Sequence, residues 1–99
     1  MVRWSYSSKR DLHQIYEYIA QDSEFYAKKV INDIVDRSEY LGDFPNMGRK
    51  VEEFDDEGLR EVIVYSYRLI YRVAVDGVNI IAIVHSSRNL ASQTLNEDM

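Results

Sequence analysis

Apolar residues recur at helical spacing in two neighbouring stretches of the N-terminal half. The first stripe runs through about Ala20, and either Ser7 or Ser8 precedes it as the candidate N-terminal cap. The second stripe follows Ser23, another candidate cap, and ends where Gly42 could provide a left-handed C-terminal cap. The apolar members of this second stripe are Ala27, Val30, Ile31, Ile34, Val35 and Leu41. Two stripes so close together predict an antiparallel helix pair.

The remaining segments have the alternation and the β-branched residues that are typical of strands. Residues 3–6 predict a short first strand, Val51 begins an edge strand or extended loop, and residues 59–65 predict the next strand. A hairpin should follow over residues 67–85, because Asp76-Gly77 is a strong signal for a type I′ turn.

Counting outward from that turn assigns the hairpin side chains to two faces. The register pairs Val75 with Val78 and, further out, Arg68 with His85 at the rim of the sheet. The core face should hold Leu69, Tyr71, Val73, Ile80, Ala82 and Val84. The other face should hold Arg68, Arg72 and His85 among Ile70, Ile81 and Ile83. A sheet surface with both aliphatic and cationic side chains suits a protein partner or a polyanion.

The length of the loop before the hairpin decides one further face assignment. With Tyr65-Ser66-Tyr67 as a three-residue loop, which we prefer, Arg60 faces Arg72 and joins the cationic face. With a two-residue loop, Glu61 lies on that face instead.

Together these elements predict an α+β two-layer domain, in which an N-terminal strand and a helix hairpin pack on a three- to four-stranded antiparallel sheet. Residues 1–90 should form this single domain. A turn over residues 43–49, which contains the only proline, leads from the helices to the sheet. Residues 91–99 should be a C-terminal tail, either frayed or a short terminal helix.

Composition narrows the class of protein. Ninety-nine residues suffice for one domain, and the absence of cysteine excludes disulfides and thiolate metal sites. With only two histidines, we expect no metal site, and we expect no cofactor. No apolar run approaches the roughly 18 residues that span a bilayer, so we expect a cytoplasmic protein with no membrane partner.

The charge distribution limits the partners further. A net charge of −5 opposes whole-molecule attraction to nucleic acid. Acidic residues concentrate in residues 52–57, which we interpret as a solvated loop, with docking of a basic partner as the alternative.

A set of short motifs runs in order through residues 4–90. They are Trp4, Asp11-Leu12, Ile15, Tyr18-Ile19-Ala20, Pro45, Gly48-Arg49, Leu59-Arg60-Glu61, residues 67–73, Val84-His85 and Arg88. In this order they resemble the RelE/ParE superfamily of toxins, from the type II toxin–antitoxin modules that serve in plasmid stabilisation and growth inhibition. The resemblance implies neutralisation by a cognate antitoxin protein, whose helix and strand wrap the toxin.

The resemblance leaves a choice between activities. RelE-like members are ribosome-dependent endonucleases that cut messenger RNA, whereas ParE-like members inhibit DNA gyrase and need no catalytic residues of their own. RNA cleavage needs a proton acceptor, cations at the phosphate and a donor for the leaving oxygen. A third alternative is an inactive relative that only binds proteins.

If the chain is a nuclease, the resemblance assigns its catalysis to Arg68, Arg88, His85 and Glu52. Arg68 falls where RelE-type nucleases place a transition-state arginine, and Arg88 falls at another basic position.

The rest of the nuclease pattern is incomplete. The lysine positions of RelE map near Leu59 and Glu61, and its terminal tyrosine maps near Thr94. In another nuclease subgroup, the expected histidine lies one residue away from His85 and Ser87 replaces the tyrosine.

This incomplete set favours the ParE-like branch, and His85-Ser86-Ser87-Arg88 together with the Gly48-Arg49 turn looks like the ParE pattern. We therefore expect a toxin that binds and inhibits DNA gyrase. Its contacts with an acidic segment of the antitoxin should come from Arg49, Arg60, Arg68, Arg72 and Arg88.

Overall fold

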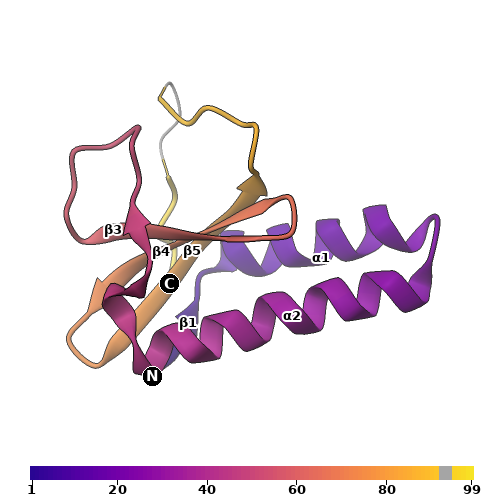
Figure 1. Cartoon of the computed structure of the whole chain (residues 1–99), viewed down its shortest axis with the longest axis horizontal. Helices are drawn as coiled ribbons and strands as arrows, with labels where there is room; N and C mark the ends of the chain where they lie inside the picture. Colours follow the sequence, from indigo (N-terminus) through magenta and orange to yellow (C-terminus); the bar gives the residue numbers. More distant parts are fainter. Residues whose placement is uncertain (92–94) are drawn as a thin grey trace.

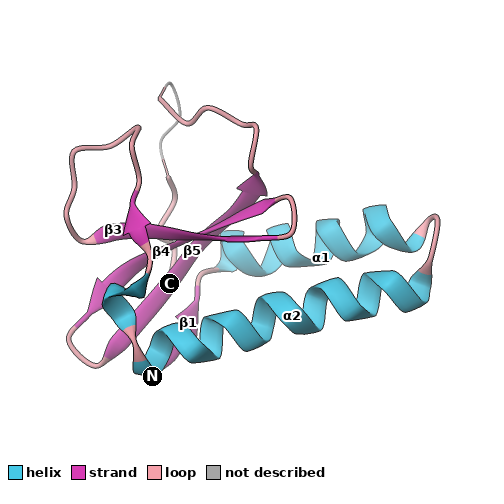
Figure 2. Cartoon of the chain, in the orientation of Figure 1, coloured by secondary structure: helices cyan, strands magenta, loops and turns pink. Residues whose placement is uncertain are grey.

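A computed structural model describes residues 1–91 and 95–99. Figures 1 and 2 show two antiparallel helices on one side of a twisted sheet. The elements are β1 (Val2–Trp4), α1 (Tyr6–Ala20), α2 (Glu24–Asp43), the 3₁₀ turn η1 (Pro45–Met47), β2 (Arg49–Lys50), β3 (Leu59–Val64), β4 (Tyr67–Ala74) and β5 (Gly77–His85). The α+β two-layer fold is confirmed. The sheet has five strands in the order β1-β5-β4-β3-β2, and it is mixed because β1 runs parallel to β5.

Serine side chains begin both helices. The hydroxyl of Ser5 accepts a hydrogen bond from the Ser8 backbone N–H at 3.0 Å, so Ser5 is the cap of α1 and the prediction of Ser7 or Ser8 was wrong. Ser23 caps α2 as predicted, accepting from the Tyr26 N–H at 3.0 Å. None of the described helices is long and apolar enough to cross a membrane.

Gly42 does not end α2, because the helix continues to Asp43 and Phe44 is its C-cap. A Cβ at position 42 would lie 2.7 Å from Cγ2 of Val2. The missing side chain therefore lets β1 cross close to the end of the helix, where a cap was predicted.

The turn of the β4–β5 hairpin lies one residue earlier than predicted. Ala74 pairs with Gly77, so that Val75 and Asp76 form the turn. Gly77 has a φ of +148°, and a Cβ there would lie 1.8 Å from the carbonyl oxygen of Met1. The absence of a side chain at Gly77 thus lets the backbone of Met1 pack against the end of the turn.

A β-bulge then changes the faces of β5. Tyr71 pairs with Ile80 but Ile70 pairs with Ala82, which leaves Ile81 as the extra residue. The bulge is held by α1, because the Ser5 hydroxyl donates to the Ile81 carbonyl oxygen at 3.0 Å. The side chain of Asp11 also accepts from the Ile83 N–H at 3.0 Å.

Beyond the bulge the predicted face assignment is wrong. Arg68 lies opposite Val84, and His85 lies opposite Tyr67 on the helix-covered face. Arg68 and His85 therefore point to opposite sides of the sheet. Ala82 and Val84 likewise move to the face that carries Arg68, because the extra residue inverts the alternation.

The β3–β4 connection is the two-residue alternative. Val64 pairs with Tyr67, so the loop consists of Tyr65 and Ser66 and the preferred three-residue loop was wrong. Tyr65 adopts a φ of +55°, which is rare for a bulky residue. Its hydroxyl donates to the Asp33 carboxylate on α2, which fixes this turn against the helix.

Apolar side chains fill both faces of the sheet. The main core lies between the sheet and the helices and includes Ile34, Leu41, Leu69, Tyr71 and Ile80. A second core lies on the other face, where the acidic loop (residues 51–58) and the segment 86–91 cover the strands. Its buried members are Val51, Leu59, Ile70, Ile81, Ala82 and Leu90. The sheet face that carries Arg68 is therefore covered in part by the chain itself.

The described end of the tail is neither frayed nor helical. Leu95 packs against the second core, and the Asp98 carboxylate accepts from the Ser7 N–H at 3.1 Å. The tail thus returns to the start of α1.

Tyr71 joins the sheet to the turn after α2, which predicts a measurable role in stability. Its hydroxyl, fully buried, donates to the Pro45 carbonyl oxygen at 2.6 Å and accepts from the Gly48 N–H at 2.8 Å. Tyr71→Phe should lower the free energy of unfolding by about 1–3 kcal/mol, because both backbone groups lose a buried partner. Denaturant titration measures this. Tyr18→Phe, at a side chain that is 71% exposed, is the control, and an equal effect of both variants would contradict the role.

Candidate functional site

Arg68 is the centre of a buried ion cluster. Its side chain is 6% exposed, and its Nε donates to Glu61 at 2.7 Å. Its terminal nitrogens donate to both oxygens of Glu53 at 2.7 and 2.8 Å, and one of them also donates to the Arg88 carbonyl oxygen at 2.9 Å. The guanidinium is therefore occupied by partners within the chain.

These contacts shift the ionisation of the partners. The hydrogen bonds from Arg68 lower the pKa of Glu53 to about 2, and the same bonds to Glu53 raise the pKa of Arg68 above its usual value. Glu61 is 2% exposed at its side chain and has a second cation, because Arg49 Nε donates to its other oxygen at 2.9 Å. Glu61 thus lies between the guanidinium groups of Arg49 and Arg68, while Glu53 pairs with Arg68.

Arg72 forms a second ion cluster nearer the tail. Its guanidinium donates to both oxygens of Glu97 at 2.7 and 2.9 Å and to Asp56 at 3.0 Å. The hydrogen bonds from Arg72 lower the pKa of Asp56. Arg72 keeps about a third of its side chain exposed, unlike Arg68.

Arg60 lies on the helix-covered side of the sheet, opposite the face that carries Arg68 and Arg72. It pairs with Tyr71, and one terminal nitrogen donates to the Gly48 carbonyl oxygen at 2.9 Å. The expectation that it joins Arg68 and Arg72 was wrong, because the two-residue loop places Glu61 there instead. Its buried Nε has no hydrogen-bond partner among the described residues.

Four of the candidate residues line one hollow of about 360 Å³ on the Arg68 face: Arg49, Arg68, Arg88 and Glu52. Glu53 and Glu61 line it too, so that three arginines face three glutamates among the described lining residues. This balance gives the hollow no strong attraction for a phosphate. Glu52 is exposed at its rim.

His85 lies at a different hollow, of about 660 Å³, between α1 and the ends of β4 and β5. Its Nδ1 accepts from the Ser87 N–H at 3.2 Å and lies 2.8 Å from the Ser87 hydroxyl. The ring meets Tyr67 edge-on at 6.1 Å between centroids. Of the other candidates, only Arg88 also lines this hollow.

The nuclease residues are therefore divided between two faces. Glu52 and Arg68 border the hollow on one face and His85 lies at the other, while Arg88 lines both hollows. Thr94, the position nearest the expected terminal tyrosine, is outside the described residues. No group of three or more potential metal ligands gathers in the part of the chain that is described.

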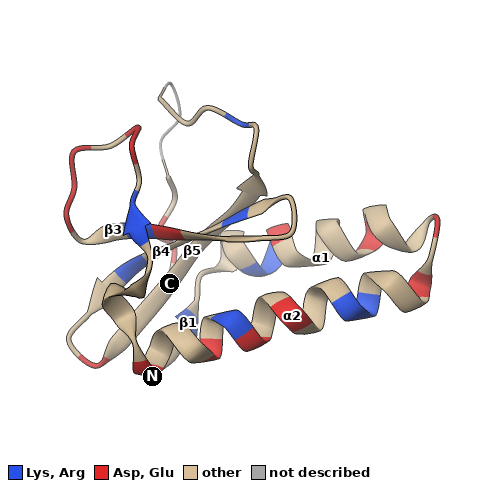
Figure 3. Ribbon diagram, in the orientation of Figure 1, with Lys and Arg blue, Asp and Glu red and all other residues tan. Residues whose placement is uncertain are grey.

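Sequence reasoning missed the acids that neutralise the arginines. Figure 3 shows acidic positions along the acidic loop, which connects β2 to β3. Glu53 and Asp56 turn inward to the arginines, whereas Asp55 and Glu57 stay exposed and bind Lys50. The acidic run itself was the available signal, but its interpretation as a solvated loop holds for only part of it.

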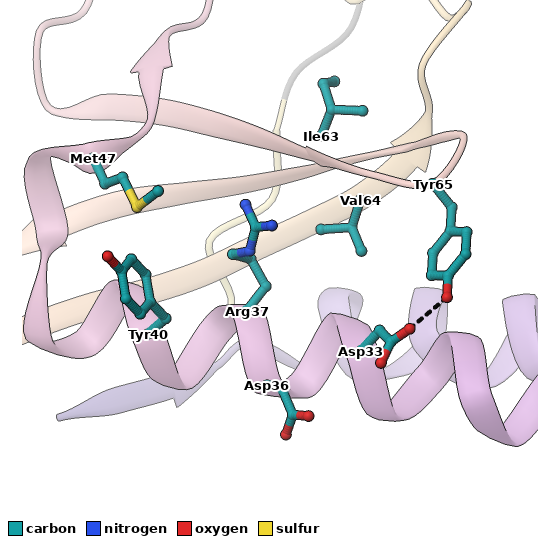
Figure 4. Close-up of a pocket in the computed structure, with 8 residues that line it drawn as sticks. All are labelled: Asp33, Asp36, Arg37, Tyr40, Met47, Ile63, Val64 and Tyr65. Carbon is teal, nitrogen blue, oxygen red and sulfur yellow. Dashed lines mark hydrogen bonds between the residues drawn. The ribbon is translucent and has the colours of Figure 1, made fainter.

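A third hollow, of about 590 Å³, also escaped the sequence analysis. It lies between α2 and the outer edge of β3, beyond the point where β2 ends. Figure 4 shows Arg37 and Tyr40 of α2 extending toward Met47 and the strand, while the Tyr65 hydroxyl reaches Asp33. This groove combines apolar and acidic side chains, which suits contact with a protein.

Comparison with known proteins completes the description. A family model described as "ParE toxin of type II toxin-antitoxin system, parDE" matches residues 2–90. A solved structure titled "Chromosomal ParDE TA system from P. aeruginosa" is similar in fold, with a TM-score of 0.69 and 23% sequence identity. The similarity covers 85% of this chain and 92% of that one. No curated protein sequence matches the chain.

Arg68 should be a strong determinant of stability. Arg68→Met should lower the free energy of unfolding by about 3 kcal/mol, because it leaves Glu53 and the buried Glu61 without the cation between them. Lys50→Met is the matched control, since Lys50 pairs with exposed acids of the same loop, and should cost less than about 1 kcal/mol. Chemical denaturation compares the two. Equal losses would mean that the cluster contributes no more than a surface pair.

Glu53 should make the free energy of unfolding depend on pH in the acidic range. Its pKa is about 2 in the folded chain and 4.5 ordinarily, so folding favours the charged form. This contribution is present above the ordinary pKa and is lost as the pH falls toward the folded value. The stability difference between wild type and Glu53→Gln should therefore shrink from about pH 6 to about pH 3 in denaturant titrations. Glu39→Gln, at an exposed site, is the control, and parallel curves for wild type and Glu53→Gln would refute this.

Proposed function

Because the chain belongs to the ParE toxin family of type II toxin–antitoxin systems, we propose that it binds and inhibits DNA gyrase and is neutralised by a cognate antitoxin. Both partners act in the cytoplasm of a bacterial cell, and we propose that the toxin acts there too. The mode of action in this proposal is binding, with no bond made or broken by the chain.

One observation carries this choice: Arg68, the expected transition-state arginine, is buried and paired with Glu53 and Glu61. A guanidinium that stabilises a phosphorane must direct its N–H donors at the substrate. His85, the candidate proton carrier, lies across the sheet, and a general acid or base must reach its proton within hydrogen-bond distance. Both features support inhibition by binding.

The hollow beside His85 supports a docking site for the antitoxin. Its described lining includes Tyr18, Tyr26, Tyr65 and Tyr67, and the first three are 71%, 47% and 43% exposed. Exposed tyrosines are enriched where proteins bind one another, because the ring buries apolar area and the hydroxyl remains hydrated. An apolar side chain of the antitoxin would fit between these rings.

The nuclease remains a second candidate on one specific observation. Arg49, Arg68, Arg88 and Glu52 line a single hollow, as an RNA-cleaving site would require. For this alternative the ion cluster of Arg68 has to open when RNA binds. An inactive protein-binding relative is the third candidate, and the three acids that balance these arginines favour it.

Two assays on the purified protein separate the candidates. We expect it to block supercoiling of relaxed plasmid by gyrase and to leave messenger RNA on ribosomes intact. The variant Glu52→Gln/His85→Gln should inhibit gyrase within about twofold of wild type, whereas loss of an acid or base would slow cleavage by about 10²-fold or more. If the wild-type protein cleaves messenger RNA, the variant does not, and neither affects supercoiling by gyrase, the nuclease alternative is established. Absence of both activities would overturn the proposal and favour the inactive relative.

A further inference from the structure

The last residues of the chain are seated on the body at three points. Leu95 packs against the second core beside Phe54. With Phe54, Leu59 and Arg72 it lines a hollow of about 310 Å³, whose other described lining residues are Asp55, Asp56 and Glu97. Glu97 then receives both hydrogen bonds from Arg72. Leu95 and Glu97 are two residues apart, so an apolar side chain and a carboxylate of the tail contact neighbouring parts of the surface.

The third point is the start of α1. The Asp98 carboxylate accepts from the Ser7 N–H and from the Ser7 hydroxyl, both at 3.1 Å. The Asp98 carbonyl oxygen also accepts from the Tyr6 N–H at 3.2 Å. These are N–H groups of the first turn of a 15-residue helix, which lack partners within the helix and favour a negative charge.

We call these receiving groups the tail strip: Phe54, Leu59, Arg72, Tyr6 and Ser7. The strip offers the apolar side chains of Phe54 and Leu59, then a guanidinium, then the N-terminus of a helix. It is therefore complementary to an extended segment with an apolar residue followed by two carboxylates. The tail presents this pattern as Leu95, Glu97 and Asp98.

The tail contacts are weaker than the contacts of the rest of the second core. Leu95 is only half-buried, and the side chains of Glu97 and Arg72 are 38% and 31% exposed. Exposed ion pairs contribute little to stability, and chain ends held by few buried contacts open locally far more often than the whole protein unfolds. By contrast, Leu90 is fully buried and its N–H donates to Glu53 at 3.1 Å. Opening can therefore release the tail and leave the Arg68 cluster in place.

We propose that the tail strip is a docking site for an acidic segment of a partner protein, and that the chain's own residues 95–98 occupy it as a competing ligand. The partner's segment carries an apolar anchor followed by two carboxylates. The antitoxin would be one such partner if the proposed function is right, but the strip is defined by this chain's own contacts. A tethered tail acts at a local concentration of about millimolar, so a partner must bind with enough affinity to displace it.

Competition with a peptide tests this directly. The probe is a fluorescently labelled peptide with the sequence of residues 90–99, titrated with full-length protein and followed by anisotropy. We expect weak binding to wild type. The variant Leu95→Ser/Glu97→Gln/Asp98→Asn, whose own tail no longer fits the strip, should bind the peptide at least tenfold more tightly. Adding Arg72→Gln to this variant should remove the gain.

The controls separate the strip from a general effect of charge. Asn96→Ser changes an exposed tail residue between the seated ones and should behave as wild type. A peptide with serine, glutamine and asparagine in place of the leucine, glutamate and aspartate should not bind. Near-ultraviolet circular dichroism checks that each variant keeps the native fold, and Glu97→Gln alone replaces the triple variant if that one does not fold.

Three results would overturn the proposal: no tighter binding by a folded tail variant, equal binding of the control peptide, or displacement of the peptide by millimolar glutamate or phosphate, which would make the strip a simple anion site. The assay contains no gyrase and no ribosome. Its failure would leave the supercoiling result untouched, and a failure of gyrase inhibition would leave the peptide result standing.

Discussion

The structure depends on one ion cluster, in which Arg68 is held between Glu53 and Glu61. It joins strand β4 to three other segments: strand β3 through Glu61, the acidic loop through Glu53, and the segment after β5 through the carbonyl oxygen of Arg88. The Leu90 N–H, which donates to Glu53, completes the connection. These bonds hold the covering segments over the second apolar core. A buried ion cluster stabilises little beyond apolar side chains of similar size, but losing one member leaves a charge without a partner.

The same pairing changes what the basic face can do. Arginines that the sequence offers to an acidic partner are paired with acids of the same chain, Arg68 with Glu53 and Arg72 with Asp56 and Glu97. The chain has a net charge of −5, and some of its acidic side chains lie on the acidic loop and the tail, where they pair with these arginines. An acidic partner that binds this face has to replace the chain's own carboxylates at these arginines. Its binding therefore depends on competition with those carboxylates more than on long-range attraction. Such exchange is easier at Arg72 than at Arg68, because the Arg72 side chain is less buried.

Local patterns predicted the elements well and the face assignments poorly. The helix pair, the cap at Ser23 and the strands of the second half follow from apolar spacing and β-branched residues, which are local properties. The bulge at Ile81 is different, because it is stabilised by Ser5 and Asp11 from the start of the chain. No pattern within the hairpin signals these contacts. The extra residue inverts the alternation of β5, so His85 lies on the opposite face from Arg68. The candidate catalytic residues are therefore divided between two faces.

The sequence by itself determined the two-layer architecture, through the spacing of its apolar residues, and the RelE/ParE resemblance, through the order of its short motifs. It also named arginines that meet at one hollow, Arg49, Arg68 and Arg88. Only the tertiary structure decided which acids neutralise them and on which face His85 lies. The physical reason is that side-chain alternation in a strand propagates any shift of register, so turns and bulges fixed by distant contacts decide the chemistry of a face. Charge pairing likewise depends on how loops fold back, and distance along the chain does not reveal it.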